Sequence, residues 1–485
     1  MNIPGATKPL SSEELNKIIE NSFCILKEIG VLVQNDELIN LLRNAGAEVS
    51  SDSQRVKFSR KFIEEFLGGA SENFDEIDGL EVSCLLPYGK RAIYSRGVEC
   101  TAGTYPQMYM DFDGDIRPHT EKTVSDMTRL ADYLPNIDRI GVMGVPSDIP
   151  AAPASLLHMR LCAWKYAQNK LSGCGEVHNK SFIPYIIEMG KIMADYKNAP
   201  LRRYAFAEVE LISPLRFMEA EAAVFVEMWK NNLLCGVGFM HSAGGSSPVT
   251  LAATVSLALC ESIFVNILYR FCFGFKKLWF QLNASVLDMK SAMFPFGRPE
   301  RGIMAIAMGQ IADKFKAGLW TSGIFADAKL PSCEAGMQAA FTMTPSVMAG
   351  SLGLECFGLL SGAEIGSPIQ LVIDNEFAGG IKRFARGFEV NENTLAYDVI
   401  KEEAESGFFT GHEHTVEHFR TEHWSPEFFS RETLSAWNKP GKKNDIGFAR
   451  EIAEKVFKDY WPQNITADVE RELRKIIKSA EKQMF

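Results

Sequence analysis

Two acidic residues within one apolar run are the first candidates for chemistry. Glu208 and Glu210 alternate in the sequence YAFAEVELIS, and because successive residues of a strand point to opposite sides, both carboxylates face the same way. Facing outward, they would be buried under helices at high cost. Facing inward, near the mouth of a barrel, they could hold a cation or accept a proton. The structural alternative, an ion pair of one of them with Arg202 or Arg203, fits the residues equally well.

Aromatic and polar side chains alternate in the same way on two later runs. Trp279, Gln281 and Asn283 share one face of a predicted strand, and Phe325 and Asp327 share one face of the next. Aromatic rings beside a carboxylate suit a quaternary ammonium ion, which carries charge but offers no N–H donor. Aromatic residues on barrel strands also serve as ordinary core, and that alternative stays open.

A glycine- and serine-rich loop, SAGGSSPVT, offers a second kind of site. Gly244 and Gly245 let the backbone approach a ligand, Ser247 can cap the helix that follows, and Pro248 suits its first turn. Free N–H groups at a helix start bind anions, so Gly244, Gly245, Ser246 and Ser247 could bind a carboxylate or phosphate. A capped helix without a ligand is the alternative, and the residues alone favour it.

The run GHEHTVEH suggests a metal site, because His414 and His418 are one helical turn apart. However, the sequence contains no HExxH, its ten cysteines form no CxxC, and the run lies in the tail. A helix start with Thr415 and Glu417 explains the run, so we expect no metal of the protein's own.

Composition narrows the class of protein. With 485 residues, 46% of them hydrophobic, the chain can form a large core and an appended domain. The formal net charge is -10 and no run of Lys and Arg is long enough to suggest a surface that follows a phosphate backbone, so we expect no nucleic acid partner. The most apolar window, 251–275, is interrupted by Glu261, Asn266 and Arg270, which predicts a buried helix and no membrane span. The start of the chain does not resemble a signal peptide, and the scattered cysteines suit the reducing cytoplasm.

The elements that must position these residues alternate between strand and helix. Apolar runs typical of strands occur at 139–146, 170–177, 204–212, 233–240, 277–286, 318–325 and 357–364, with an eighth at 369–374. Helical patterns lie between them at 153–169, 181–196, 217–231, 248–271, 299–316 and 334–350. This alternation predicts an α/β protein with a parallel sheet, and its spacing fits a closed (β/α)8 TIM barrel of roughly 250 residues better than an open sheet. Neither GxGxxG nor GxxxxGK[ST] opens a helix, which argues against dinucleotide and P-loop folds.

We therefore divide the chain into three parts. Residues 1–134 form an N-terminal α+β cap region, with helical patterns over 11–69 and a hairpin at Asp113-Gly114. Residues 135–388 form the barrel. Residues 389–485 form a C-terminal helical extension packed on it.

The sequence also resembles the trimethylamine methyltransferase superfamily, specifically its members without pyrrolysine that act on quaternary amines. The resemblance runs nearly end to end and is carried, in order, by ILKEIGVLVQ, LLRNAGAEV, DFDGDIRPHT, DYLPNID with PSDIP, ISPLRF, SAGGSSPVTLAA, FADAKLPSCEAGMQ and GHEHTVEHFRTEHWSPEFFSRETLSAW.

The resemblance implies a (β/α)8 barrel that moves a methyl group from an amine nitrogen to the Co(I) centre of a corrinoid (cobalamin) carried by a separate cognate protein. In the trimethylamine enzymes pyrrolysine falls within the turn that here reads AKLPSC, where the standard residues Ser332 or Cys333 stand. This departure shifts the expected substrate from trimethylamine to a small quaternary amine of the glycine betaine, proline betaine, carnitine or γ-butyrobetaine type.

Such a substrate loses a methyl group to leave a neutral tertiary amine, so we expect residues that position it and no general acid. Glu210 or Asp327 would supply the countercharge, and a basic group or helix start would take the substrate carboxylate. The residues expected around the substrate are Trp279, Gln281, Phe325, Asp327, Glu208, Glu210, Phe357 and Tyr105. Two alternatives are a tertiary amine or other methyl donor, and a non-catalytic betaine-binding barrel. We expect the protein to form a homo-oligomer and not to associate with a membrane.

Overall fold

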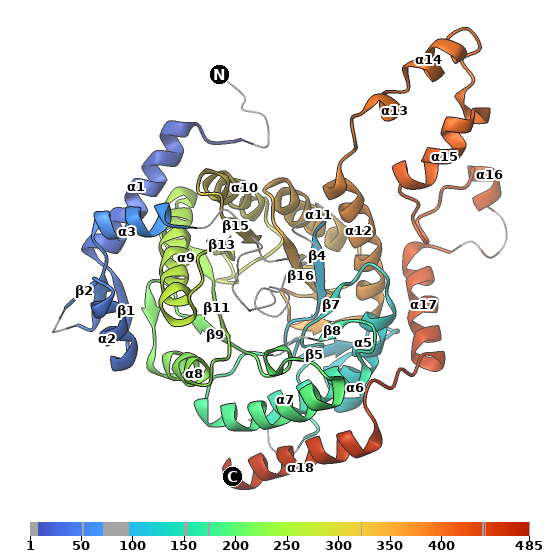
Figure 1. Cartoon of the computed structure of the whole chain (residues 1–485). Helices are drawn as coiled ribbons and strands as arrows, with labels where there is room; N and C mark the ends of the chain where they lie inside the picture. The colour runs from blue at the N-terminus through green and yellow to red at the C-terminus, as the bar shows by residue number, and fades with distance from the viewer. Residues whose placement is uncertain are drawn as a thin grey trace.

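The computed structural model of the chain describes residues 8–50, 53–70, 97–149, 154–172, 175–321, 323–438, 441 and 443–484. Within them, eight strands follow one another around a ring, and helices surround it (Figure 1). In chain order the strands of the ring are β4 (Glu99–Ala102), β7 (Arg139–Ile140), β8 (Leu171–Ser172), β9 (Ala207–Leu211), β11 (Cys235–Phe239), β13 (Trp279–Leu282), β15 (Gly318–Thr321) and β16 (Gly353–Phe357).

Neighbouring strands of the ring pair in parallel. β16, β4, β7 and β8 form one sheet, β9 pairs with β11, and β13 pairs with β15. Three contacts connect these groups: the bridge Glu176–Glu208, the pairing of β12 (His241–Ala243) with β14 (Ala284–Val286), and the bridge Leu319–Ser351. Since β12 and β14 directly follow β11 and β13, this second contact links those two strands. The mixed α/β class predicted from the sequence is confirmed.

The helices outside the ring alternate with its strands along the chain. They are α5 (Glu121–Tyr133), α6 (Ser155–Tyr166), α7 (Ile183–Lys197), α8 (Glu219–Lys230), α9 (Leu251–Phe273), α10 (Pro299–Lys314), α11 (Cys333–Met348) and α12 (Pro368–Arg386). α6 to α11 occupy the predicted helical patterns, but α9 begins three residues later than predicted, after Thr250, which makes no side-chain cap hydrogen bond. The capping role predicted for Ser247 is therefore wrong.

The predicted eighth strand, 369–374, is also wrong, because these residues lie in α12. Ser367 Oγ accepts a hydrogen bond from the Gln370 N–H and Pro368 occupies the first turn, and both features start helices. The strand that the prediction lacks is β4, whose four residues, ECTA, give little apolar signal. β4 pairs with β16 on one side and β7 on the other, so part of the predicted cap region belongs to this sheet. The division at residues 134 and 388 remains a prediction.

The N-terminal helices pack against α9. This part of the chain comprises α1 (Ser12–Glu28), β1 (Val31–Val33), α2 (Asp36–Asn44), β2 (Glu48–Val49), β3 (Arg55–Lys57) and α3 (Arg60–Gly68), and β1 pairs with β10 (Arg216–Phe217). Ser22 Oγ in α1 donates to the Ser256 carbonyl in α9 at 2.9 Å. α9 is long and apolar enough to span a membrane, but 83% of its most apolar window is buried in the protein. The prediction of a buried helix is confirmed.

A small sheet lies beside the ring. It contains β5 (Met108–Met110), β6 (Ile116–Pro118), β17 (Leu359–Leu360) and β18 (Ile365–Gly366). β5 and β6 are antiparallel and Gly114 between them has φ +91°, so the predicted hairpin is confirmed.

The C-terminal segment contains mostly short helices followed by two longer ones. They are α13 (Glu392–Leu395), α14 (Tyr397–Glu403), α15 (Glu413–Glu422), α16 (Leu434–Trp437), α17 (Asp445–Asp459) and α18 (Ala467–Met484). Among the described residues, short 3-10 helices also occur at η3 (Lys180–Phe182), η4 (Leu201–Arg203) and η5 (Phe409–Gly411). The segment around α17 and α18 is tied to the ring helices: Arg129 in α5 donates to the Tyr460 carbonyl at 2.5 Å, and Asn464 donates to the Trp164 carbonyl at 2.7 Å.

Candidate functional site

The strands of the ring carry apolar residues on one face and polar residues on the other. In β9, Ala207, Val209 and Leu211 pack into the main hydrophobic core, so Glu208 and Glu210 point to the opposite side. We call this side, which faces away from the surrounding helices, the inner face. By the same alternation, its half-buried residues include Glu99, Arg139, Glu208, Glu210, Gln281, Trp320 and Glu355. The inside of the ring is therefore polar, whereas barrel interiors are usually filled by branched apolar side chains.

Four carboxylates interact on the inner face. Burial, with the Glu176 carboxylate next in effect, raises the pKa of Glu208 to about 7. Burial and then Glu208 raise the pKa of Glu355 to about 8. Burial raises the pKa of Glu210 well above its ordinary value, and Glu176, Glu208 and Glu355 raise it further. Because Glu355 lies on β16 and Glu208 on β9, these charges act across the ring. Carboxyl groups held partly neutral in this way ionise when a cation binds beside them.

Two glycines make room for the carboxylates of β9. Gly236 and Gly238 in β11 pair in register with Glu208 and Glu210. A Cβ at residue 238 would lie 2.4 Å from Glu210 Oε1, and one at residue 236 would lie 3.0 Å from Glu208 Cγ. Neither contact is possible without movement, so the alternation of glycine in CGVGF is what lets both side chains lie over β11.

Arginine residues balance part of the negative charge. Arg139, the first residue of β7, has its Nε 3.6 Å from Glu99 Oε1, and it lowers the pKa of both Glu208 and Glu355. Arg301 in α10 donates to Asn283 Oδ1 at 3.2 Å, and burial lowers its pKa to about 10. The inner face thus holds both signs of charge, with carboxylates in excess.

Two tryptophans contribute aromatic surface. Trp279 is 7% exposed, and its ring occupies the space over Gly318, where a Cβ would lie 2.4 Å from Trp279 Cε3. Trp320 lies opposite the core residue Leu319 and is half-buried on the inner face. Trp279 is the first residue of β13, so it lies toward the amino ends of the strands, below Gln281, whose Nε2 donates to the Val237 carbonyl at 3.1 Å.

Phe325 and Asp327 lie beyond β15, which ends at Thr321, and both already have partners. Phe325 is 4% exposed and stacks on Phe296 with ring centroids 4.1 Å apart, and the guanidinium carbon of Arg301 lies 4.9 Å from its centroid. The Phe296 and Gly297 N–H groups each donate to Asp327 at 2.8 Å. The cation on this aromatic pair is therefore Arg301.

Phe357 and Tyr105 have different environments. Phe357 is fully buried in the core with Leu354. A regular strand would place it on the same face as Glu355, but Cys356 has φ +72° and the pairing register shifts there, which turns Phe357 outward. Tyr105, in the loop after β4, accepts a hydrogen bond at its hydroxyl from the Glu176 N–H, so it lies beside the carboxylates.

The glycine-serine loop is closed on itself. The N–H groups of Gly245 and Ser247 donate to the Ser242 carbonyl at 2.8 and 3.0 Å, and Gly244 N–H donates to the Ser247 carbonyl at 2.9 Å. Ser246 Oγ accepts from the Ser242 N–H at 2.9 Å. A hollow of about 570 Å³ lies between this loop and α1, apart from the inner face. Three of the four N–H groups predicted to bind an anion thus already have acceptors.

The turn that we predicted to match the pyrrolysine position lies at the surface. Ser332 Oγ accepts from the Ala335 N–H at 3.3 Å and caps α11, and Cys333 is the exposed first residue of that helix. All eight described cysteines are free thiols.

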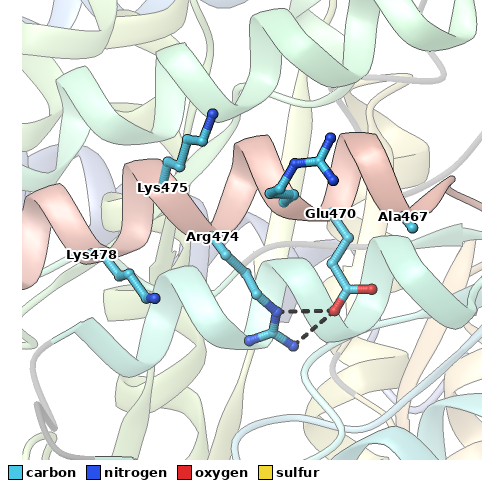
Figure 2. A pocket seen from close by; sticks show the side chains of 6 residues that line it. Ala467, Glu470, Arg474, Lys475 and Lys478 are labelled. Atoms are coloured by element: carbon cyan, nitrogen blue, oxygen red, sulfur yellow. Dashed lines mark hydrogen bonds and ion pairs between the residues drawn. The ribbon is translucent and has the colours of Figure 1, made fainter.

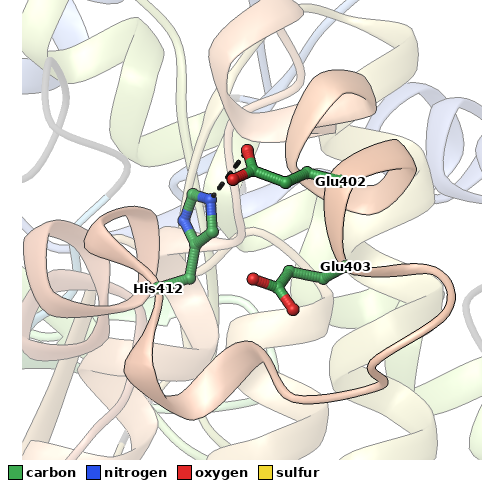
Figure 3. A group of neighbouring side chains, drawn as sticks. All are labelled: Glu402, Glu403 and His412. Carbon is green, nitrogen blue, oxygen red and sulfur yellow. Dashed lines mark ion pairs between the residues drawn. The ribbon is translucent and has the colours of Figure 1, made fainter.

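Within the described residues, one group of three metal-ligating side chains lies close together: Glu402, Glu403 and His412 (Figure 3). Its donor atoms lie within 4.8 Å of one another. His412 Nδ1, however, accepts the cap hydrogen bond from the His414 N–H at 3.1 Å, so the proton of the neutral ring is on Nε2, 3.6 Å from Glu402 Oε2. A metal at Nε2 would require this cap to break. The geometry fits a histidine–glutamate contact at the start of α15.

A groove of about 410 Å³ along α18 is also charged (Figure 2). Arg474 bonds Glu470 and Glu121, Arg471 bonds Asp468, and Lys475 bonds Glu472. Paired charges on an exposed helix contribute little to binding, and we assign no site here.

Sequence reasoning missed Arg139, Glu176, Trp320 and Glu355. Arg139, Glu176 and Glu355 each lie within or beside an apolar run, which is the signal that identified Glu208. Glu355 escaped because the strand was predicted to begin at 357. Arg139 and Glu176 lie near the ends of predicted runs, where the alternation is hardest to assign.

The chain is similar in sequence to known proteins over nearly its whole length. The family model described as Trimethylamine methyltransferase (MTTB) matches residues 2–484. Trimethylamine methyltransferase MttB of Desulfitobacterium hafniense is 23% identical over 472 residues, 97% of this chain and 93% of the relative. Glycine betaine methyltransferase of D. hafniense strain Y51 is 21% identical over 471 residues, 96% of each. The structure of Methanosarcina barkeri monomethylamine methyltransferase (MtmB) aligns over 96% of this chain and 94% of that chain with 12% identity and a TM-score of 0.45.

Proposed function

The chain belongs to the trimethylamine methyltransferase family, and we propose that it moves a methyl group from a small quaternary amine to the Co(I) centre of a separate corrinoid protein. The proposed donors are betaines: glycine betaine, proline betaine, carnitine or γ-butyrobetaine. The proposed setting is the cytoplasm, and the partner is a cognate corrinoid protein.

The observation that carries this proposal is the group of carboxylates on the inner face. Glu208 and Glu210 on β9 interact electrostatically with Glu355 on β16, so a cation placed among them would favour the ionised form of all three carboxyl groups and be attracted by them. A unit charge about 5 Å away contributes roughly 3 kcal/mol at an effective dielectric constant of about 20. Trp320 adds an aromatic surface of the kind that binds quaternary ammonium groups.

The charges are also arranged for a zwitterion. Arg139 is the first residue of β7, whereas Glu210 is the second-to-last residue of β9, so the two charges are offset along the strands. Arg139 Nε is buried and makes no hydrogen bond to the described residues; its nearest ion-pair partner is Glu99 Oε1 at 3.6 Å. A betaine whose carboxylate reaches toward Arg139 would hold its ammonium group near Glu210, with a methyl group toward the carboxyl ends of the strands.

We further propose that the eight parallel strands close a (β/α)8 barrel with the reaction at the carboxyl ends of its strands. The loops at those ends expose large apolar side chains, which fit the docking of a second protein: Met240, Met289, Met293 and Leu330. When bound there, the corrinoid would supply a strong nucleophile at cobalt.

The chain's own residues would then act by position and charge. Losing a methyl group turns the quaternary nitrogen into a neutral amine, so no residue has to donate a proton to the leaving group. Glu208 and Glu210 hold the ammonium group until transfer, and their attraction for the product falls once its charge is gone. Docking of the partner over the apolar loops excludes water from the reacting methyl group.

A second candidate donor is a protonated tertiary amine, and a specific observation favours it. The inner face is richer in carboxylates than in aromatic rings, and a tertiary ammonium offers one N–H that a carboxylate accepts. Glu208 and Glu355, with pKa values raised to about 7 and 8, could exchange that proton at neutral pH.

Calorimetric titration of glycine betaine into the wild-type protein, Glu210→Gln and a surface control, Glu65→Gln, tests the proposal. We expect Glu210→Gln to weaken binding by about 100-fold, from the loss of roughly 3 kcal/mol of attraction, and Glu65→Gln to leave it unchanged. Equal affinity in all three proteins, or no binding of any betaine by the wild type, would contradict it.

A further inference from the structure

A segment near the C-terminus leaves the body of the protein and returns to it. We call residues 388–422 the arm; it contains α13, α14, η5 and α15 and projects beyond α12 (Figure 1). Its base is fixed to α12, where Arg386 donates to the Thr421 carbonyl and Arg383 Nε donates to the Glu422 carbonyl at 2.8 Å.

The arm has no core of its own. The structure describes all of it, and each of its residues is at least partly exposed. Its helices have 4, 7 and 10 residues, and isolated helices shorter than about 12 residues are marginal in water. An ordered arm therefore needs a surface to pack against.

The arm carries the apolar side chains that such packing needs. Nine large ones are between 39% and 74% exposed: Phe388, Val390, Leu395, Tyr397, Ile400, Phe408, Phe409, Val416 and Phe419. With roughly 150–250 Å² for each aromatic side chain and somewhat less for the aliphatic ones, they expose on the order of 1,000 Å². A stable protein interface buries about 800 Å² on each partner, so the arm alone offers an interface of standard size.

The charge of the arm restricts what can cover it. It contains nine acidic and two basic side chains, which repels nucleic acid and anionic membranes. Two arms facing each other would repel in the same way, so the covering surface is not another arm.

From these observations we infer that the arm packs on the body of a second copy of this chain. A partner that binds only during turnover would leave the apolar area exposed between encounters, whereas another copy is present whenever the protein is. Most soluble oligomers are built from identical chains. This inference does not depend on the proposed function, because it concerns a surface away from the inner face.

Cross-linking between isotopically distinct copies tests the inference directly. Lys401 is the arm's single lysine. We would mix ¹⁵N-labelled and unlabelled full-length protein, let subunits exchange, and apply an amine-reactive cross-linker. After equal amounts have exchanged, about half of the peptide pairs that join Lys401 to a lysine outside the arm should contain one heavy and one light peptide. Pairs found only within one isotope after exchange, or a monomeric wild-type protein at micromolar concentration, would overturn the inference.

Substitutions in the arm provide a second, independent test. Phe408→Ser with Phe409→Ser, and separately Tyr397→Ser with Ile400→Ser, should raise the subunit dissociation constant about 100-fold by light scattering. Ile116→Ser, an exposed apolar residue on β6, is the matched control. Circular dichroism should show an unchanged fold in each. Unchanged association in both double variants would refute the inference.

Discussion

Replacing Gly238 with alanine perturbs the inner face without removing a charge. The added Cβ would lie 2.4 Å from Glu210 Oε1, about 1 Å closer than ordinary contact, which begins near 3.4 Å. The carboxylate must therefore move by about 1 Å. Moving a charge from about 5 to about 6 Å from a cation loses roughly 0.6 kcal/mol at an effective dielectric constant of about 20. With some strain from overpacking, the total is about 1.5 kcal/mol, or a roughly tenfold loss of affinity.

Two further glycine variants turn this prediction into a graded series, measured as betaine affinity by calorimetry. Gly236→Ala meets Glu208 Cγ at 3.0 Å and should weaken binding about threefold. The Cβ added in Gly68→Ala would have no atom within 4 Å, so this variant should leave the betaine affinity unchanged. Combining Gly238→Ala with Glu210→Asp shortens the acidic side chain and should restore part of the betaine affinity that Gly238→Ala loses. If the two substitutions acted independently, their losses of binding free energy would add. Equal affinity for Gly238→Ala and Gly68→Ala would refute the reasoning.

Three other predictions follow from the described contacts. The pKa values of Glu208 and Glu355 are raised to about 7 and 8, so the affinity for a quaternary amine should increase as pH rises through this window. Binding should release protons, which calorimetry in buffers of different ionisation enthalpy would measure. An affinity that does not depend on pH would contradict this prediction. Glu208 and Glu355 bind more protons in the native protein than in the unfolded chain between about pH 5 and 8, so their contribution to the free energy of unfolding without ligand should fall as pH rises there. The free energy of unfolding of Glu208→Gln should therefore fall less, or rise more, with pH than that of the wild type; the same pH dependence in both proteins would contradict the raised pKa value of Glu208. Phe325→Ala should reduce the free energy of unfolding by about 3 kcal/mol, because this ring packs on Phe296 and Arg301. The betaine affinity of the folded fraction should change little. Unchanged stability in thermal melts together with weaker betaine binding in titrations would instead place Phe325 in the site.

The alternation of side chains along strands carried most of the information that the sequence held about the site. One polar residue between two apolar ones predicted the shared orientation of Glu208 and Glu210, which the burial pattern of β9 shows. The same rule misplaced Phe357, because the positive φ of Cys356 breaks the alternation, and nothing in the residue types signals that bulge.

Other features depend on contacts between distant parts of the chain. The stacking of Phe325 with Phe296 and the hydrogen bonds from the 296–297 backbone to Asp327 join two segments outside the strands that are about 30 residues apart, so no local pattern predicts them. β4 is too short to be recognised from its own residues and takes its place in the ring through pairing with β16 and β7. Helix positions, by contrast, follow from periodic apolar residues and agree closely for α6 to α11.

Turnover of a panel of methyl donors with reduced cobalamin as acceptor tests the central claim most directly. Demethylated product would be counted by NMR for glycine betaine, proline betaine, carnitine, γ-butyrobetaine and trimethylamine, with the wild type and with Glu210→Gln. We predict that at least one betaine is demethylated, that Glu210→Gln lowers kcat/KM for it by about 100-fold, and that trimethylamine is a poor donor. Trimethylamine turned over as fast as or faster than every betaine, or no product from any quaternary amine, would contradict the account.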